Sequence, residues 1–422
     1  MRKIYILLFS LFSVASMAQD VTVDYIADVE ARAGRYITIE GSLTLNDDVD
    51  AGSCSLEVST IDADGAKHVL STVPFSELGV TLQFKGAFAG FGFDVDPLDT
   101  PLRSTLRATV VGSTAATPYA EATLVNRGTT YDRNVVVEEG TGTWCQYCVR
   151  GIVGMEYMAT TYPDRFIGIG VHNNDSYAVD SYQGLINMMG GGLPCCIMNR
   201  TDSFDPSQEN LETYYKKVIG TRVDAQVEFC SASYDESTRT VTATAACRWA
   251  YTIQNGGDYR LIFVVTEDGI EDYQKNAYAG GAYGAMGGFE SKTNPCLTAI
   301  PDVARAICPN LLGTKNRLKA NDIVYDRPLA DTRTFTLPEG TGSADKLTLV
   351  ALLVDGSTSA VINAAKVKFS DFGSIEDPLT GIDGVSANTG TTATSPQRGA
   401  WGAPYWLSPT IYIQNGRKIL KH

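Results

Sequence analysis

Two cysteines three residues apart, Cys145 and Cys148, form the motif of this sequence best suited to chemistry. They stand in the run Trp144-Cys145-Gln146-Tyr147-Cys148, between an apolar run at 135–137 and a segment, 149–160, with apolar residues at helical spacing. The free N–H groups and the dipole at the start of a helix stabilise a thiolate and lower the pKa of a cysteine held there. We therefore expect Cys145 to be the nucleophile of thiol–disulfide exchange and Cys148 to be the thiol that resolves the mixed disulfide.

Three further residues are candidates for the same site. Trp144 directly precedes the motif, and Glu139 lies six residues before Cys145, where its carboxylate can exchange a proton with Cys148. An ordinary acid at the end of a strand is an equal alternative for Glu139. Pro194 follows a glycine-rich turn and opens a later strand, where a cis peptide bond can bring the backbone beside the sulfurs.

The elements around the motif alternate between strand and helix. A continuous apolar run such as Val135-Val136-Val137 is typical of a strand buried on both faces. We expect strands at 135–139, 166–171 and 194–198, and helices at 149–160, 181–189 and 207–219. This order predicts a small α/β domain over 129–222.

These features resemble a known superfamily. The stretch 135–172, with Trp-Cys-x-x-Cys, the upstream acid and the later proline, is similar to thioredoxin-like domains. More narrowly, the sequence resembles the Bacteroidetes family related to outer membrane protein 28 through the runs VEEGTGTWCQYC, PCCIMNR and VTEDGI, the last followed by Gln274. The likeness covers about residues 130 to 368 and implies a thioredoxin-like domain followed by a β-sandwich, on the cell envelope.

The sequence departs from that family directly after Pro194. Small or hydroxyl residues are usual there, whereas this chain has Cys195 and Cys196. If the fold holds, one of these thiols points near the Cys145–Cys148 pair, where it could form an alternative disulfide. The interpretation we favour is that both are small buried residues of a strand.

Sequence typical of β structure flanks the α/β segment. Residues 19–128 alternate short strand patterns with turn signals, which predicts an immunoglobulin-like β-sandwich. Residues 223–370 predict a second β-sandwich-type domain, in which only 302–308 has a helical pattern. Residues 371–409 have the composition of a linker, and 410–422 predict a C-terminal hairpin. The predicted fold class is therefore multi-domain, with an all-β sandwich, a thioredoxin-like α/β domain, a second β-sandwich-type domain, and a linker plus hairpin.

The first 18 residues have the features of a cleavable signal peptide, with Arg2-Lys3, an apolar run and small residues before Gln19. We expect an exported protein of the periplasm, outer membrane or cell surface, with no transmembrane helix after cleavage. Loss of Arg2 and Lys3 changes the formal charge from −14 to −16, which makes nucleic acid and anionic membranes poor partners. The tail 411–420 resembles the C-terminal ends of exported Bacteroidetes proteins, which makes surface delivery an open alternative.

The remaining cysteines allow further bridges. The chain has nine cysteines, so at least one thiol is left over if every pair is intramolecular. Cys296 and Cys308 flank the segment with the helical pattern and could pair. Cys230 and Cys247 fall roughly on one face of two joined strands, so a diagonal bridge is open to them.

Metal and hydrolase chemistry find little support in the sequence. A zinc site from the motif cysteines, Cys195 or Cys196 and His172 is disfavoured, because the chain has one Cys-x-x-Cys and three histidines. No catalytic Ser-His-Asp pattern or His-Glu-x-x-His is present. We therefore expect no cofactor and no metal.

Two functions fit these patterns. The first is an envelope thiol–disulfide oxidoreductase that acts through Cys145 on protein thiols or disulfides, or on a redox partner protein. The second is a surface binding or adhesion protein, in which the α/β domain is a scaffold and Cys145–Cys148 a static disulfide. Whether the chain is an enzyme depends on whether this couple cycles between its two states.

Overall fold

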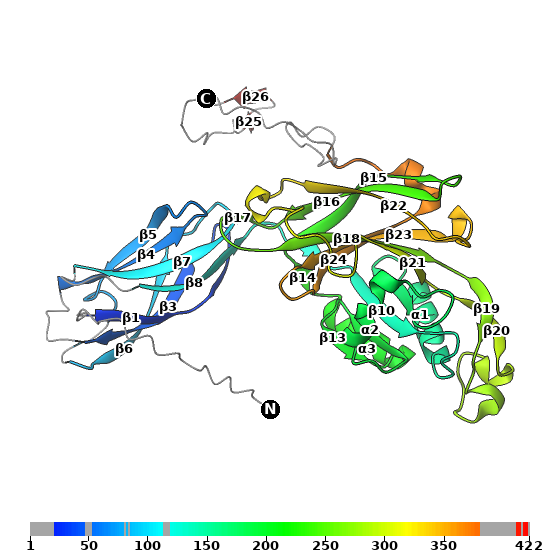
Figure 1. The fold of residues 1–422 in the computed structure, drawn as a ribbon. Helices are drawn as coiled ribbons and strands as arrows, with labels where there is room; N and C mark the ends of the chain where they lie inside the picture. Colours follow the sequence, from blue (N-terminus) through cyan, green and yellow to red (C-terminus); the bar gives the residue numbers. More distant parts are fainter. Residues whose placement is uncertain are drawn as a thin grey trace. The chain divides into compact units, whose positions relative to one another are not determined.

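The computed structural model describes residues 21–46, 53–79, 82, 85–112 and 119–379, and the backbone of 411–414 and 417–420. These residues form a β-rich protein built from several sheets (Figure 1). The predicted signal peptide and most of the predicted linker lie outside the described residues. No helix in the described part of the chain is long and apolar enough to cross a membrane.

The N-terminal residues form two sheets that share one apolar core. The alternating burial along β7 (Leu102–Val111) places Leu102, Leu106 and Val110 in this core. The first sheet contains β1 (Val21–Ile26), β3 (Ile37–Leu45) and β6 (Phe88–Val95). The second contains β2 (Val29–Arg32), β8 (Tyr119–Arg127), β7 (Leu102–Val111), β4 (Ser55–Ile61) and β5 (Lys67–Pro74), and β17 (Thr252–Ile253) pairs with β7.

One eight-stranded sheet organises most of the chain that follows. In spatial order its strands are β13 (Asp202–Phe204), β12 (Cys195–Met198), β10 (Val135–Thr141), β11 (Phe166–His172), β21 (Val303–Cys308), β18 (Tyr259–Glu267), β23 (Leu347–Asp355) and β24 (Val361–Lys368). Strands β10 and β11 run parallel, whereas β12 is antiparallel to β10. Strand β21 joins β11 through the Gly170–Val303 pair, so the sheet continues across the predicted boundary between 222 and 223.

The helices cover both faces of the β10–β11 part of this sheet. α1 (Val149–Thr161) and α3 (Gln208–Val218) pack with Val135 and Val137 on one face. α2 (Gly184–Met188), preceded by the 3₁₀ turn η2 (Asp180–Tyr182), packs with Val136 on the other. The three valines are fully buried, which confirms that their strand is covered on both faces.

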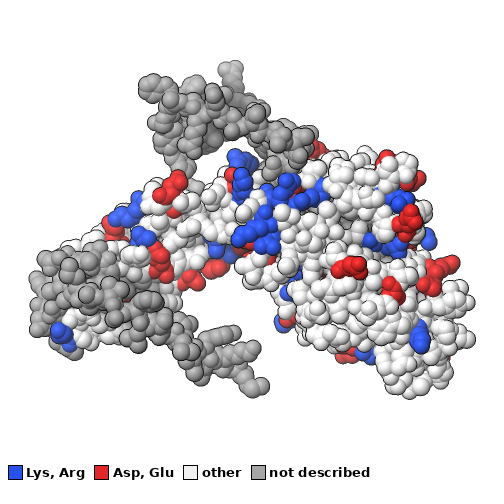
Figure 2. Space-filling model, viewed as in Figure 1, with Lys and Arg blue, Asp and Glu red and all other residues white. Residues whose placement is uncertain are grey.

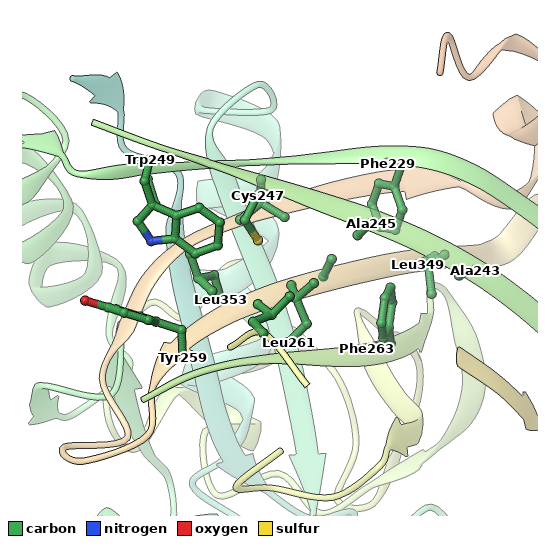
Figure 3. Close-up of a cluster of buried hydrophobic side chains, with 14 of the residues drawn as sticks. Phe229, Ala243, Ala245, Cys247, Trp249, Tyr259, Leu261, Phe263, Leu349 and Leu353 are labelled. Atoms are coloured by element: carbon green, nitrogen blue, oxygen red, sulfur yellow. The ribbon is translucent and has the colours of Figure 1, made fainter. Parts of the chain in front are cut away.

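A second large core lies between the eight-stranded sheet and a three-stranded sheet. The latter contains β15 (Ala225–Asp235), β16 (Thr240–Trp249) and β22 (Leu329–Thr336). Figure 3 shows Trp249, Cys247 and Ala245 above Leu261 and Phe263 in this core. Alternate residues of β18, such as Ile262 and Val264, pack with α2 on the opposite face.

One expectation about the C-terminal half is wrong, and two bridges that the sequence left open do not form. Residues 303–308 form strand β21 rather than a helix, because pairing with β18 and β11 outweighs the local helical pattern. Cys230 and Cys247 are free, because Cys247 lies opposite Val227 and the alternation of side chains along β15 places Cys230 on the other face, in a separate small cluster.

Cys296 and Cys308 are also free thiols rather than a bridge. Cys296 packs beside α1, whereas Cys308 packs at the edge of the core that contains Trp249. The two cysteines therefore belong to different parts of the interior.

A hairpin projects from the β18–β21 connection toward α1. It contains β19 (Ile270–Gln274) and β20 (Cys296–Ile300), and we call residues 275–295 between them the hairpin loop. The hairpin loop contains the turns η3 (Ala279–Gly281) and η4 (Phe289–Ser291). Its Tyr278 and Phe289 pack on Val149 and Ile152 of α1.

The remaining elements are short. They are β9 (Tyr131–Asp132), which pairs with β14 (Arg222–Val223), and the 3₁₀ turns η5 (Ala320–Asp322), η6 (Ala344–Lys346) and η7 (Phe369–Ser374). At the C-terminus, β25 (Ile411–Gln414) pairs with β26 (Arg417–Leu420) where the sequence predicts a hairpin.

Charged side chains of both signs are scattered over the face shown in Figure 2. Basic residues gather near the middle of this face, and much of the surface around them is uncharged.

Candidate functional site

The motif cysteines lie between a buried strand and the first turn of a helix. β10 ends at Thr141, and Cys148 is the N-cap residue of α1. The N–H of Cys145 donates to the carbonyl of Gly142, and the N–H of Cys148 donates to the carbonyl of Cys145, which forms two successive turns. Cys145 therefore lies on the N-terminal side of α1, where the helix dipole favours an anion.

Cys145 and Cys148 form the one disulfide among the described residues. Cys145 is 5% exposed and Cys148 is fully buried, whereas the neighbouring Trp144 is 47% exposed. The indole N–H of Trp144 donates to the carbonyl of Asn173 at 2.7 Å, which fixes the ring at the surface beside the motif.

Glu139 is buried beneath α1. A Cβ atom added to Gly151 would lie 1.8 Å from Oε1 of Glu139, so the glycine leaves the space that the carboxyl group occupies. Oε1 has no hydrogen-bond partner among the described residues. Burial, with a smaller contribution from the charge of Asp205, raises the pKa of Glu139 to about 8, although a hydrogen bond from Thr141 opposes the shift.

Pro194 lies at the start of the strand next to β10. The Leu193–Pro194 peptide bond is cis. In the antiparallel pairing of β12 with β10, Cys195 lies opposite Gly140 and Cys196 opposite Glu139. Pro194 therefore comes directly before a strand that begins beside the carboxyl end of β10, where the motif loop starts.

Cys195 and Cys196 point to opposite faces of the sheet. Cys196 is fully buried in the cluster under α1 and α3, on the same face as Glu139, whereas Cys195 packs in the cluster that contains α2. Both thiols are free. Burial raises the pKa of each, so neither thiol ionises readily in the folded protein.

Arg150, in the first turn of α1, is engaged in contacts beside the motif. Its guanidinium forms an ion pair with Asp205 at 2.6 Å and donates to the hydroxyl of Tyr278 at 3.4 Å. The side chain therefore links α1 to the start of α3 and to the hairpin loop.

Comparisons with known proteins give distant structural likenesses. No protein-family model matches the chain, and no curated protein matches it. Among solved structures, HBP35 of Porphyromonas gingivalis is 16% identical, with 70% of this chain and 86% of that chain covered and a TM-score of 0.42. A protein from Agrobacterium tumefaciens is 14% identical, with 57% of this chain and 96% of that chain covered and a TM-score of 0.33.

A domain of the outer membrane lipoprotein Omp28 from Porphyromonas gingivalis is also similar. It is 13% identical, with 35% of this chain and 88% of that chain covered and a TM-score of 0.20. All three TM-scores are below 0.5, so the proposals below rest on the geometry of this chain.

A histidine–aspartate pair supports the loop before the motif. Nδ1 of His172 lies 2.7 Å from Oδ2 of Asp175, and the same oxygen accepts the N–H of Thr143 at 2.9 Å. Burial opposes ionisation of Asp175, but these contacts outweigh it and hold the pKa of Asp175 below its ordinary value. His172 thus has a neighbour that the sequence pattern did not identify.

The end of β19 and the hairpin loop supply contacts that sequence reasoning missed. The side-chain amide of Gln274 donates to the carbonyls of Gly142 and Cys145 at 3.2 and 2.8 Å. The hydroxyl groups of Tyr147 and Tyr283 lie 3.2 Å apart. The quoted family resemblance included Gln274, but the spacing along the sequence gave no signal that it reaches the motif.

Proposed function

We propose that this protein carries a thioredoxin-like domain and exchanges disulfides with protein substrates through Cys145 and Cys148. The observation that carries the proposal is a disulfide at the N-terminus of α1, next to a strand that holds a buried glutamate, one oxygen of which has no hydrogen-bond partner within the described part of the chain. Such a helix terminus favours the thiolate form of Cys145 once the bond is reduced.

The local topology supports this domain assignment. β10, α1 and β11 form a parallel unit, followed by the antiparallel pair β12–β13 and by α3. The spatial order β11-β10-β12-β13 places the motif strand in the centre. Pro194, at the start of β12, is proposed to line the site together with Trp144 and Glu139.

The exchange proceeds in two balanced steps. The thiolate of Cys145 attacks one sulfur of a substrate disulfide, which breaks the substrate S–S bond, forms a mixed disulfide and releases one substrate thiolate. Cys148 loses its proton and attacks the sulfur of Cys145, which forms the Cys145–Cys148 bond and releases the second substrate thiolate. The substrate gains two electrons and the protein loses them, and the reverse sequence oxidises a dithiol substrate.

Glu139 is proposed to take the proton from Cys148. A general base works best when its pKa is close to the operating pH, and the pKa of Glu139 is raised to about 8. Because Gly151 has no side chain, the carboxyl group of Glu139 can lie against the first turn of α1, one helical turn from Cys148. This placement supports a proton-transfer role over that of an ordinary strand-end acid.

The setting is proposed to be the cell envelope, in the periplasm, at the outer membrane or on the cell surface. The signal-peptide pattern at residues 1–18 supports export, and an oxidising compartment permits a disulfide couple. The proposed partners are protein thiols or disulfides, or a redox partner protein.

The proposal is tested by the redox equilibrium of the full mature chain with glutathione. A working couple should have a reduction potential above about −300 mV, and reduced Cys145 should alkylate with a pKa well below about 8.5. Cys145→Ser should abolish turnover of a protein disulfide. Cys195→Ser is the control and should retain turnover, because the Cys195 thiol lies on the face of the sheet opposite to Glu139. An unperturbed Cys145 or a potential far below −300 mV would overturn the proposal.

One observation favours the second candidate function, a surface binding protein with a static disulfide. Cys145 is only 5% exposed and Cys148 is fully buried, which limits direct attack by a large partner. In that case Cys145→Ser should lower stability and leave cellular function intact.

A further inference from the structure

We propose that Gln274 is a positioning residue, which holds Cys145 and Cys148 close together when their disulfide is open. This inference rests on the proposed exchange function and deepens it. It assigns part of the control of the couple to the hairpin that follows the α/β segment in the chain.

The contacts of Gln274 converge on the motif. Its Nε2 atom donates to the carbonyl of Gly142 at 3.2 Å and to the carbonyl of Cys145 at 2.8 Å. These carbonyls also accept the N–H groups of Cys145 and Cys148, and thereby close the two turns on either side of Cys145. One amide group therefore ties together both turns that set the position of the nucleophile.

The position of Gln274 is itself fixed. The side chain is 1% exposed, and the next residues extend the contact through their backbones, with Lys275 N–H donating to Thr143 O and Ala277 N–H donating to Gln146 O, both at 2.9 Å. The fully buried Asn276 donates to Phe289 O and Thr293 O, which closes the hairpin loop on itself. The amide is therefore held in place before it binds the motif.

The consequence differs between the two redox states. In the oxidised protein the S–S bond itself restrains the Cys145–Cys148 turn. In the reduced protein no covalent bond restrains it, so the contacts from Gln274 and Lys275 keep the two thiols at a high effective concentration. Loss of the Gln274 side chain should therefore increase the mobility of the Cys145–Cys148 turn more in the reduced protein than in the oxidised protein. The disulfide should then be less stable relative to the two thiols.

The test is a redox equilibrium with glutathione. In this reaction the protein disulfide and two molecules of reduced glutathione give the protein dithiol and one molecule of glutathione disulfide. Gln274→Met keeps the size of the side chain and removes both donors. We expect its equilibrium constant for disulfide formation to fall about tenfold, which is ~30 mV toward a more oxidising couple. The alkylation pKa of reduced Cys145 should rise in the same variant, because the turn no longer holds its sulfur at the helix terminus.

Gln183→Met is the matched control. Gln183 also donates through Nε2 to two main-chain carbonyls, those of His172 and Val179, but it does not touch the motif. Its removal should leave the potential and the pKa of Cys145 unchanged even where it lowers thermal stability. Lys275→Pro removes the separate bond to Thr143 O without altering a buried side chain, and should shift the potential in the same direction by a smaller amount.

The outcomes separate this inference from the function on which it rests. If the unaltered protein exchanges disulfides and Gln274→Met, folded by circular dichroism, keeps the same potential, the positioning role is wrong. If Gln183→Met shifts the potential equally, the effect is general loss of stability and the inference again fails. If the unaltered protein exchanges nothing, the proposed function fails instead.

Discussion

Glu138 and Glu139 are neighbours on the same buried strand and face opposite sides of the sheet. The carboxylate of Glu138 accepts two bonds from Arg200, both at 2.8 Å, and one from the hydroxyl of Tyr182. The side chains of Glu138 and Arg200 are fully buried. Glu139 faces α1, where Oε1 has no partner among the described residues and burial raises its pKa to about 8.

The comparison shows that depth of burial alone does not decide what an acid does. A buried carboxylate with a guanidinium partner and a hydroxyl donor is a fixed structural charge, and its energy depends on the pair as a unit. A buried carboxyl group without a cation changes its protonation near neutral pH instead. The first arrangement joins strands and loops, and the second suits proton transfer beside a thiol.

The largest expected effect comes from removing the cation that pairs with Glu138. Arg200→Met would leave Glu138 buried without its cation, and we expect a loss of about 3–5 kcal/mol in the free energy of unfolding, measured with urea. Arg107→Met is the control, because Arg107 pairs with Glu121 at a partly exposed site and should cost no more than about 1 kcal/mol. Equal losses in the two variants would contradict the structural role given to Glu138.

The role of Glu139, which has no cation beside its carboxyl group among the described residues, is tested through the pH dependence of stability. The pKa of Glu139 is raised from 4.5 to about 8 in the folded state, so the unfolded chain gives up this proton at lower pH than the folded chain. Stability should therefore fall as pH rises from about 4.5 to 8, by on the order of a few kcal/mol, and then level off.

Glu139→Gln should remove the part of this decline that Glu139 contributes in urea titrations at pH 5 and pH 8, and the part that remains belongs to groups such as Asp302, whose pKa burial raises to about 7. Glu138→Gln should instead lower stability at both pH values, because it leaves Arg200 without its partner. A decline of the same size in Glu139→Gln and in the unaltered protein would show that another group carries it.

Gly151 tests how tightly the unpaired acid is enclosed. Alanine favours a helix interior over glycine by about 1 kcal/mol, yet its Cβ would lie 1.8 Å from Oε1 of Glu139. We expect Gly151→Ala to lower the free energy of unfolding by about 1–3 kcal/mol. In a Glu139→Ala background the same change should become neutral or stabilising, and a loss that persists there would place the clash elsewhere.

The smallest expected effect concerns Asp205, whose charge contributes to the raised pKa of Glu139. Asp205→Asn should lower that pKa by less than about one unit, because Arg150 already offsets much of the charge of Asp205. Carboxyl titration by NMR would measure the shift. Asp202→Asn, an exposed acid on β13, should leave the titration unchanged.

The sequence predicted the local elements around the site well. The continuous valines of β10, the apolar spacing of α1 and the glycine-rich turn before Pro194 each have a local cause, so their positions could be read from neighbouring residues. The pattern at 303–308 misled, because Ala and Arg favour a helix locally whereas the place between β11 and β18 requires a strand.

Contacts between distant segments could not be predicted in the same way. The sequence states that Glu138 and Glu139 are adjacent and that a strand sends them to opposite faces. It does not state that Arg200 lies on one face, or that the glycine of α1 leaves a space on the other. The register of β15 on β16, which places Cys230 and Cys247 on opposite faces, likewise depends on strand pairing rather than on local spacing.

By itself, the sequence determined that two cysteines stand at the start of a helix, after a buried strand that carries an acid. Periodicity and side-chain type are local properties, and they suffice for that conclusion. Only the tertiary structure decided that Gln274, 129 residues after Cys145, binds the carbonyl of that cysteine. Such a contact depends on how the eight-stranded sheet brings β19 beside α1, and that arrangement arises from the packing of the whole chain.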